Sequence, residues 1–301
     1  MADEALMPEG PLCEFVREHA GRALEGLTPL VQSDVDELEA ALTVRSVHDT
    51  RTSLRRLRAV LRAVAGDGAG ATATDHDLRT VARALGEVRD SDVLRENLLD
   101  EQEPLTPEQL RSPQHLPPQL PDPQPGAEPS AATDRARTEL SAALHRRRRL
   151  GAEQVGRARL GPEWARVLAQ LEHWHRDPPP VLIERPAELL EGLRGRTRSR
   201  LRAAGGDTTA LHAARRAAKR WRYVAEMLLP VLPEASTHVE EANRIHTRLG
   251  ELQDAVVAVE FLREHRGELR RRGRDDALAA ALLEREERRM LQIVAEAPQL
   301  L

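Results

Sequence analysis

Aromatic residues are nearly absent from this chain of 301 residues, which contains three Trp, two Phe and one Tyr. A hydrophobic core with so few rings has to be built from Leu, Ala and Val, and such a core suits packed helices better than a β-sandwich. Proteins that bind single-stranded nucleic acid usually stack its bases on aromatic side chains. The composition therefore disfavours nucleic acid as a partner.

Cysteine and long apolar segments are also scarce. The single cysteine, Cys13, excludes an internal disulfide and fits a reducing compartment. No apolar run approaches the length of a membrane span, and the first residues, MADEALMPEG, are acidic and lack the apolar core of a signal peptide. We therefore expect a cytoplasmic protein that has no membrane partner.

Lysine is the scarcest charged residue, since Lys219 is the only one among the 45 basic residues. Genomic base composition explains the excess of arginine, so the distribution of charge is more informative than the residue type. The net charge is −4, yet residues 45–62 hold six Arg and one Asp, and residues 194–222 hold nine Arg, one Lys and one Asp. Basic clusters in a chain that is acidic overall indicate a polyanion ligand at one site.

Helical periodicity dominates the sequence, and no stretch shows sustained two-residue alternation. The pattern predicts an all-α fold with helices near 11–29, 46–65, 75–99, 132–158, 162–175, 186–204, 209–229, 234–265 and 275–296. Prolines in residues 104–130 predict a disordered insertion, which could independently bind a protein partner. A second break at 178–186 predicts a linker between two halves, 12–176 and 184–301, of a single domain 12–301.

The two halves share a repeat at a constant offset in the numbering. VHDTRTSLRRLRAVL, from Val47, aligns with LHAARRAAKRWRYVAEML, from Leu211, at an offset of 164. LGEVRDSDV, from Leu85, aligns with LGELQDAVV, from Leu249, at the same offset. Two motifs that keep one offset predict an internal duplication, with the Pro-rich segment inserted into the first of two related helical bundles.

Each copy of the first motif places basic side chains on one helix face and apolar side chains on another. We interpret Ser46 and Asp49 as a capping box, which puts His48 in the first turn of its helix. The basic rows consist of His48, Arg51, Arg55, Arg58 and Arg62 in the first copy and of His212, Arg215, Lys219 and Arg222 in the second.

Such a row of like charges needs a partner, because neighbouring cations on a helix repel by about 0.2–0.5 kcal/mol per pair. Guanidinium groups bind phosphate oxygens in pairs and stay charged at any cellular pH. The N–H groups at a helix N-terminus also favour an anion. A long anion with regularly spaced charges matches a row better than a single phosphate does.

The two pairs of motifs resemble the CHAD domain (conserved histidine α-helical domain) over about residues 12–301. The resemblance implies an all-helical fold of two related bundles around a central basic cavity or pore. It also implies non-catalytic binding of inorganic polyphosphate, in bacteria at polyphosphate granules, and we expect no metal or other cofactor. The residues expected to bind are the two basic rows, their neighbours Arg56, Arg216, Arg220 and Tyr223, and a further row of Arg194, Arg198 and Arg202.

Some of these residues have a second interpretation. Three arginines lie beside the main rows and suit ion pairs with acids as well as ligand binding: Arg56, Arg216 and Arg220. Tyr223 can donate to a phosphate or pack in the core. We expect Asp90, Asp92 and Asp254 of the second motif to hold arginines in place or to cap helices rather than to bind a metal ion. Gln253, where the first half has Arg89, leaves open whether both halves bind equally.

Two other functions compete with polyphosphate binding. The pairs His48-Asp49 and His76-Asp77 match the metal ligands of helical HD phosphohydrolases, but the second copy has Ala213 in place of the acid. A nucleic acid or another polyanion, such as an inositol polyphosphate, would also suit a row of phosphate contacts.

Overall fold

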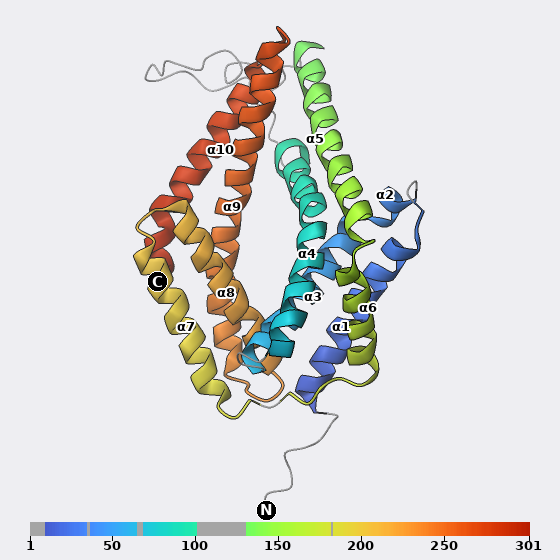
Figure 1. Ribbon diagram of the computed structural model, residues 1–301. Helices are drawn as coiled ribbons and strands as arrows, with labels where there is room; N and C mark the ends of the chain where they lie inside the picture. The colour runs from blue at the N-terminus through green and yellow to red at the C-terminus, as the bar shows by residue number, and fades with distance from the viewer. Residues whose placement is uncertain (1–9, 35–36, 65–68, 101–130, 182) are drawn as a thin grey trace, which may run out of the picture.

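The computed structural model describes residues 10–34, 37–64, 69–100, 131–181 and 183–301, and the predicted Pro-rich insertion 104–130 lies outside them. All regular secondary structure in these ranges is helical (Figure 1). The elements are α1 Pro11–Gln32, α2 Leu38–Ala41, α3 Val44–Val64, α4 Ala69–Arg95, a π-helical turn Glu96–Asp100, α5 Ala131–Ala158, α6 Pro162–Arg176, α7 Pro186–Ala203, α8 Thr208–Leu228, α9 Ala235–Arg271, α10 Ala277–Glu296 and a 3-10 turn Ala297–Leu300.

All nine predicted helices are present, so the all-α prediction is confirmed. The helix predicted for 234–265 continues to Arg271, and the one predicted from residue 75 begins at Ala69. The four residues of α2 and the π-helical turn after α4 were not predicted. A single turn is too short to show helical periodicity, and a π turn replaces the usual bonding over four residues by one over five.

The predicted capping box at Ser46 is wrong. The α3 helix begins at Val44, and the hydroxyl oxygen of Thr43 accepts a hydrogen bond of 3.1 Å from the Ser46 backbone N–H. In α8, the Asp207 carboxylate accepts a hydrogen bond of 2.8 Å from the Thr209 backbone N–H. His48 therefore lies one turn further into its helix than expected, because Thr43 provides the cap instead.

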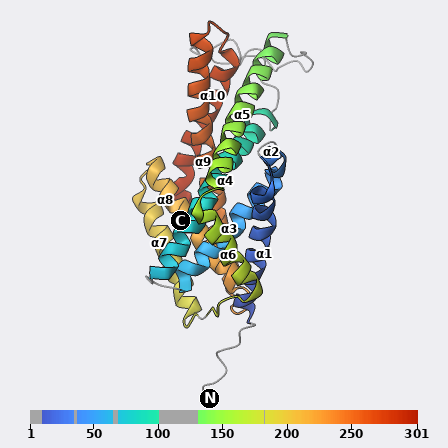
Figure 2. The same cartoon turned by 45° about the vertical axis from the view of Figure 1, so that its right-hand side comes forward.

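Neighbouring helices along the chain pack against each other in two series, α1, α3, α4 and α5 in one and α7, α8, α9 and α10 in the other. The α6 helix covers α1 and α4. The two series meet where α3 contacts α8 and α4 contacts α9. Helices α5, α9 and α10 extend beyond the others at one end of the molecule, as two views show (Figures 1 and 2).

The core consists mainly of Leu, Ala and Val, as the composition predicts. The larger apolar cluster spans both series and includes the fully buried Trp164 and Trp221. A smaller cluster joins the extended ends of the helices, where Leu140, Phe261 and Leu282 are buried. None of the described helices is long and apolar enough to cross a membrane.

Candidate anion-binding cavity

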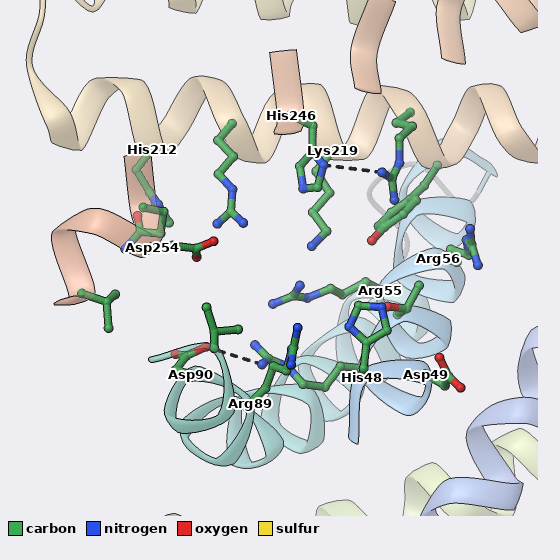
Figure 3. Close-up of a pocket in the computed structure, with 18 of the residues that line it drawn as sticks. His48, Asp49, Arg55, Arg56, Arg89, Asp90, His212, Lys219, His246 and Asp254 are labelled. Carbon is green, nitrogen blue, oxygen red and sulfur yellow. Dashed lines mark hydrogen bonds and ion pairs between the residues drawn. The ribbon is translucent and has the colours of Figure 1, made fainter. Parts of the chain in front are cut away.

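A cavity of ≈ 600 Å³ lies between α3 and α4 of one series and α8 and α9 of the other (Figure 3). Helix α3 contributes His48, Asp49, Arg51, Thr52, Arg55 and Arg56, and helix α4 contributes Arg89, Asp90, Val93 and Leu94. Helix α8 contributes His212, Arg215, Lys219, Arg222 and Tyr223, and helix α9 contributes His246, Gln253, Asp254 and Val257. The cavity is therefore walled by one basic helix from each half of the chain.

The structure brings the central members of the two predicted rows together. His48, Arg51 and Arg55 line the cavity from α3, and His212, Arg215, Lys219 and Arg222 line it from α8. Two residues predicted beside the rows, Arg56 and Tyr223, line it as well. Helical spacing places each row on one face, and the contact between α3 and α8 makes the two faces converge.

The C-terminal end of the first row is not in the cavity. The Asp75 carboxylate of α4 accepts hydrogen bonds from Arg58 at 2.9 Å and from Arg62 at 2.7 Å. Arg220 of α8 donates to the backbone carbonyl of Arg62 at 2.9 Å, and Arg216 is exposed. These four arginines were predicted to bind the ligand, but acids or carbonyls engage three of them and the fourth faces solvent.

The row predicted along α7 also lies elsewhere. Arg194 and Arg198 both form ion pairs with Glu241 of α9, at 2.9 and 2.8 Å. Arg202 is exposed. The α7 helix packs on α8 and α9. Arg194 and Arg198 therefore pair with Glu241 of α9 and do not line the cavity.

The second repeated motif contributes more to the cavity than predicted. Arg89 and Asp90 of α4 and Gln253 and Asp254 of α9 all face it. The Asp90 carboxylate lies 3.6 Å from a guanidinium nitrogen of Arg51, which agrees with the predicted role of holding an arginine. The repetition of the motif was the signal that could have marked these positions as part of the site.

His246 lines the cavity but was not predicted from the sequence. It lies on α9, and Ala82 occupies the corresponding position in the first copy of the repeat, so the alignment gives no indication of it. An Arg222 guanidinium nitrogen lies 3.5 Å from the His246 ring Nδ1. Only the packing of α9 against α8 brings this ring to the cavity.

Cations outnumber carboxylates among the lining residues, which include six Arg and one Lys but only three Asp. Glu226 compensates two of the cations, since Arg56 donates to it at 2.8 Å and Arg222 lies 3.1 Å from it. Arg55, Arg215 and Lys219 form no ion pair with any carboxylate in the described part of the chain. We refer to these three groups as the uncompensated cations because they lack an ion pair, although the more distant charges of Asp254 and Asp90 act on Arg215.

The pKa values of the cavity groups report the same imbalance. Burial, followed by the charges of Arg55 and Arg215, lowers the pKa of Lys219 well below its usual value. Burial and the charge of Arg55 lower the pKa of Arg51 to about 10, and burial and the charge of Lys219 lower that of His246 to about 2. An anion in the cavity would oppose each shift, because it favours the protonated forms.

Tyr223 contacts several of the cations, and some buried donors of the cluster lack an acceptor. Cationic groups of Lys219, Arg56 and Arg222 lie 5.8, 5.5 and 5.0 Å from the centre of the Tyr223 ring. The π-face of the ring offsets part of their mutual repulsion. The buried Nε atoms of Arg51 and Arg215 have no hydrogen-bond acceptor in the described structure. The cavity thus offers donors and positive charge to an oxyanion.

Comparison with known proteins agrees with the fold and with the motifs. The family model for the CHAD domain matches residues 22–263, a range that contains both basic rows and both copies of the second motif. The chain belongs to the CHAD family. A crystal structure of the CHAD domain from the plant Ricinus communis has a TM-score of 0.56 to this structure at 19% identity, and the match covers 98% of this chain and 89% of that chain.

At that identity the plant CHAD domain shows the fold of this chain and nothing about its ligand. A search of curated proteins finds no match. The resemblance stated from the sequence motifs is confirmed at the level of the family. What the cavity binds has to be argued from the cavity's own chemistry.

Proposed function

We propose that this CHAD protein binds inorganic polyphosphate in the cavity between α3, α4, α8 and α9 and does not turn it over. The observation that carries the proposal is that Arg55, Arg215 and Lys219 converge from two helices and form no ion pair with a carboxylate of the described residues. Guanidinium groups suit phosphate because their N–H groups match its oxygens in pairs. The CHAD resemblance implies the same ligand.

A polymeric phosphate suits this site better than a single phosphate group does. The uncompensated cations come from both walls of the cavity, so one small anion would neutralise a part of them only. We propose that the halves are duplicated units that together form a basic passage for a polyphosphate chain, with association to polyphosphate granules as the cellular consequence. Six lining residues support the duplication because they form three pairs at the offset of the repeat: His48 and His212, Arg51 and Arg215, and Arg55 and Lys219.

We propose binding rather than hydrolysis because the acids of the two candidate HD pairs hold arginines. Asp77 accepts hydrogen bonds from Arg166 at 2.6 and 2.9 Å, and Asp49 forms an ion pair with Arg45 at 3.6 Å. Within the described residues, no three His, Cys, Asp or Glu side chains are grouped to hold a metal ion. Release of inorganic phosphate from polyphosphate in the presence of Mg²⁺ or Mn²⁺ would contradict this part of the proposal.

Calorimetric titration with long-chain polyphosphate at two salt concentrations tests the binding site. The variant Arg55→Ala/Arg215→Ala removes two cavity cations, and the control Arg202→Ala/Arg216→Ala removes two exposed arginines with the same change in net charge. We expect the cavity variant to lose at least about 100-fold in affinity, since each of the two lost contacts to a charged group contributes about 1.5–3 kcal/mol. The control variant should bind like the parent chain.

The salt dependence and a competing polymer decide between ligand classes. We expect the logarithm of the affinity to fall with the logarithm of salt concentration by about 0.7 per phosphate contact, by analogy with single-stranded nucleic acids. Single-stranded DNA of equal charge should bind more weakly, because Tyr223 is the only Phe, Tyr or Trp among the lining residues of the cavity. Equal binding of both polymers would make the protein a general polyanion binder.

A further inference from the structure

Lys219 is the one amine in a cavity whose other basic groups are guanidinium groups and histidines. Figure 3 shows Lys219 reaching from α8 into the same space as Arg55 from α3. The charged and titratable groups that line this space are His48, Asp49, Arg51, Arg55 and Arg56 of α3, Arg89 and Asp90 of α4, His212, Arg215, Arg222 and Tyr223 of α8, and His246 and Asp254 of α9. No carboxylate of the described residues forms an ion pair with Lys219, so no neighbouring negative charge stabilises its ammonium form.

An amine in this position differs from its arginine neighbours in one chemical respect. Arginine keeps its proton at cellular pH, whereas lysine can release it when the surroundings disfavour charge. The cluster around Lys219 disfavours charge, because burial and four guanidinium groups all act in the same direction. The neutral form of a lysine is a nucleophile, and the guanidinium groups that line the same cavity suit the phosphate group of a donor.

We propose that Lys219 is a modification site for small acyl phosphates, which the cavity arginines bind through the phosphate group. The Lys219 nitrogen attacks the carbonyl carbon, an N–C bond forms, and the C–O bond to the phosphate breaks. The departing phosphate takes the electron pair of that bond and the surplus proton of the amine. The products are an uncharged amide on Lys219 and inorganic phosphate, with no change of oxidation state.

An acylated Lys219 can no longer take up a proton beside a bound anion, so acylation would weaken polyphosphate binding, and bound polyphosphate would in turn exclude the acyl donor. Only this competition rests on the proposed function. The acylation step needs an amine and an anion-binding cavity, whatever the physiological polyanion is.

The test incubates the full chain with acetyl phosphate near neutral pH and follows each amine by peptide mass spectrometry. Because Lys219 is the only lysine, the α-amine of the N-terminus is the single competing amine and serves as an internal reference. We expect the ratio of Lys219 to α-amine acetylation to be at least about tenfold higher in the folded chain than in the urea-unfolded chain, because only the folded cavity holds the donor beside the amine. The Lys219→Arg variant sets the background.

Matched variants and an uncharged acyl donor distinguish two causes of fast acetylation. One is binding of the donor's phosphate group by the arginines, and the other is the reactivity of the amine itself. Arg55→Ala should lower the ratio for acetyl phosphate more than for the uncharged donor N-acetoxysuccinimide, and the exposed Arg216→Ala should leave both ratios unchanged. A folded-chain ratio no higher than the unfolded one overturns the inference, even if calorimetry shows polyphosphate binding. Fast acetylation of Lys219 that polyphosphate does not slow supports the modification site and contradicts the proposed function.

Discussion

The charge of Lys219 should favour the proposed ligand binding and disfavour the stability of the free protein. Changing Lys219 to Met keeps the apolar stem and removes a charge that burial and four arginines disfavour. We expect the melting temperature of the free protein to rise by about 2 °C, because about 1 kcal/mol shifts a domain of this size by a few degrees. Polyphosphate affinity should fall at least about tenfold, which is the loss of one charge-assisted contact.

Differential scanning fluorimetry and calorimetric titration measure the two effects of Lys219→Met. The matched control is Arg216→Ala, which removes an exposed cation from the same helix and should change neither quantity. A lower melting temperature for Lys219→Met would mean that the lysine is stabilised by the folded protein, contrary to the charge distribution described above.

Asp75 of α4 forms ion pairs with two arginines of α3. Asp75 links α4 to α3 through Arg58 and Arg62, and its side chain is 16% exposed. Although burial opposes it, hydrogen bonds from the two arginines lower the pKa of Asp75. Asp75→Asn should lower the free energy of unfolding by about 2 kcal/mol, because it leaves the partly buried Arg58 without a counter-ion.

Urea denaturation tests the Asp75→Asn prediction, which requires a lower midpoint at an unchanged slope. Glu153→Gln is the control, because it removes an exposed acid that pairs with Arg149 at 3.8 Å and should change stability by less than about 0.5 kcal/mol. Polyphosphate affinity should be unchanged, since Asp75 does not line the cavity. A large loss of affinity would show that the end of the row reaches the ligand.

Glu226 joins the two halves and at the same time neutralises cavity cations. It accepts two hydrogen bonds from Arg56 of α3, at 2.9 and 2.8 Å, and lies 3.1 Å from Arg222 of its own helix. Glu226→Gln should destabilise the contact between α3 and α8 and release positive charge toward the cavity. We expect polyphosphate to bind about threefold to tenfold more tightly while the urea midpoint falls, an affinity gain of about 1 kcal/mol. Unchanged affinity would show that Glu226 is a structural ion pair only.

The molecule as a whole should lose stability in mild acid. The pKa values of five histidines are lowered, chiefly by burial: His19, His48, His212, His246 and His265. A histidine with a lowered folded-state pKa binds fewer protons in the folded than in the unfolded chain. The free energy of unfolding therefore falls as the pH drops through about 6.5, the value for an unfolded chain.

His19 allows this pH dependence to be measured at one residue. Burial and the charge of Arg56 lower its pKa to about 3, so it should contribute about 2 kcal/mol of the loss at pH 5. His19→Gln should reduce the slope of stability against pH in urea titrations, and the exposed His145→Gln should not. Polyphosphate should restore part of the lost stability, because it favours the protonated forms of the three cavity histidines but not of His19.

Much of the fold and part of the site could be predicted, because the patterns that carry them are local. Helices follow from apolar spacing within short windows of the chain, and the alignment of His48 with His212 or of Arg55 with Lys219 is visible without a structure. The start of α3 was misplaced because Thr43 and Ser46 are both good caps, and only the geometry distinguishes them.

The sequence by itself determined the helices, the two basic rows and the membership of the CHAD family. Only the tertiary structure decided which cations face the cavity. Arg58 and Arg222 occupy equivalent positions of the repeat like the other pairs, yet Arg58 binds Asp75 and Arg222 lines the cavity. Ion pairing depends on distances of a few ångströms between side chains of different helices, and those distances are set when the helices pack, not by the spacing of residues along one of them.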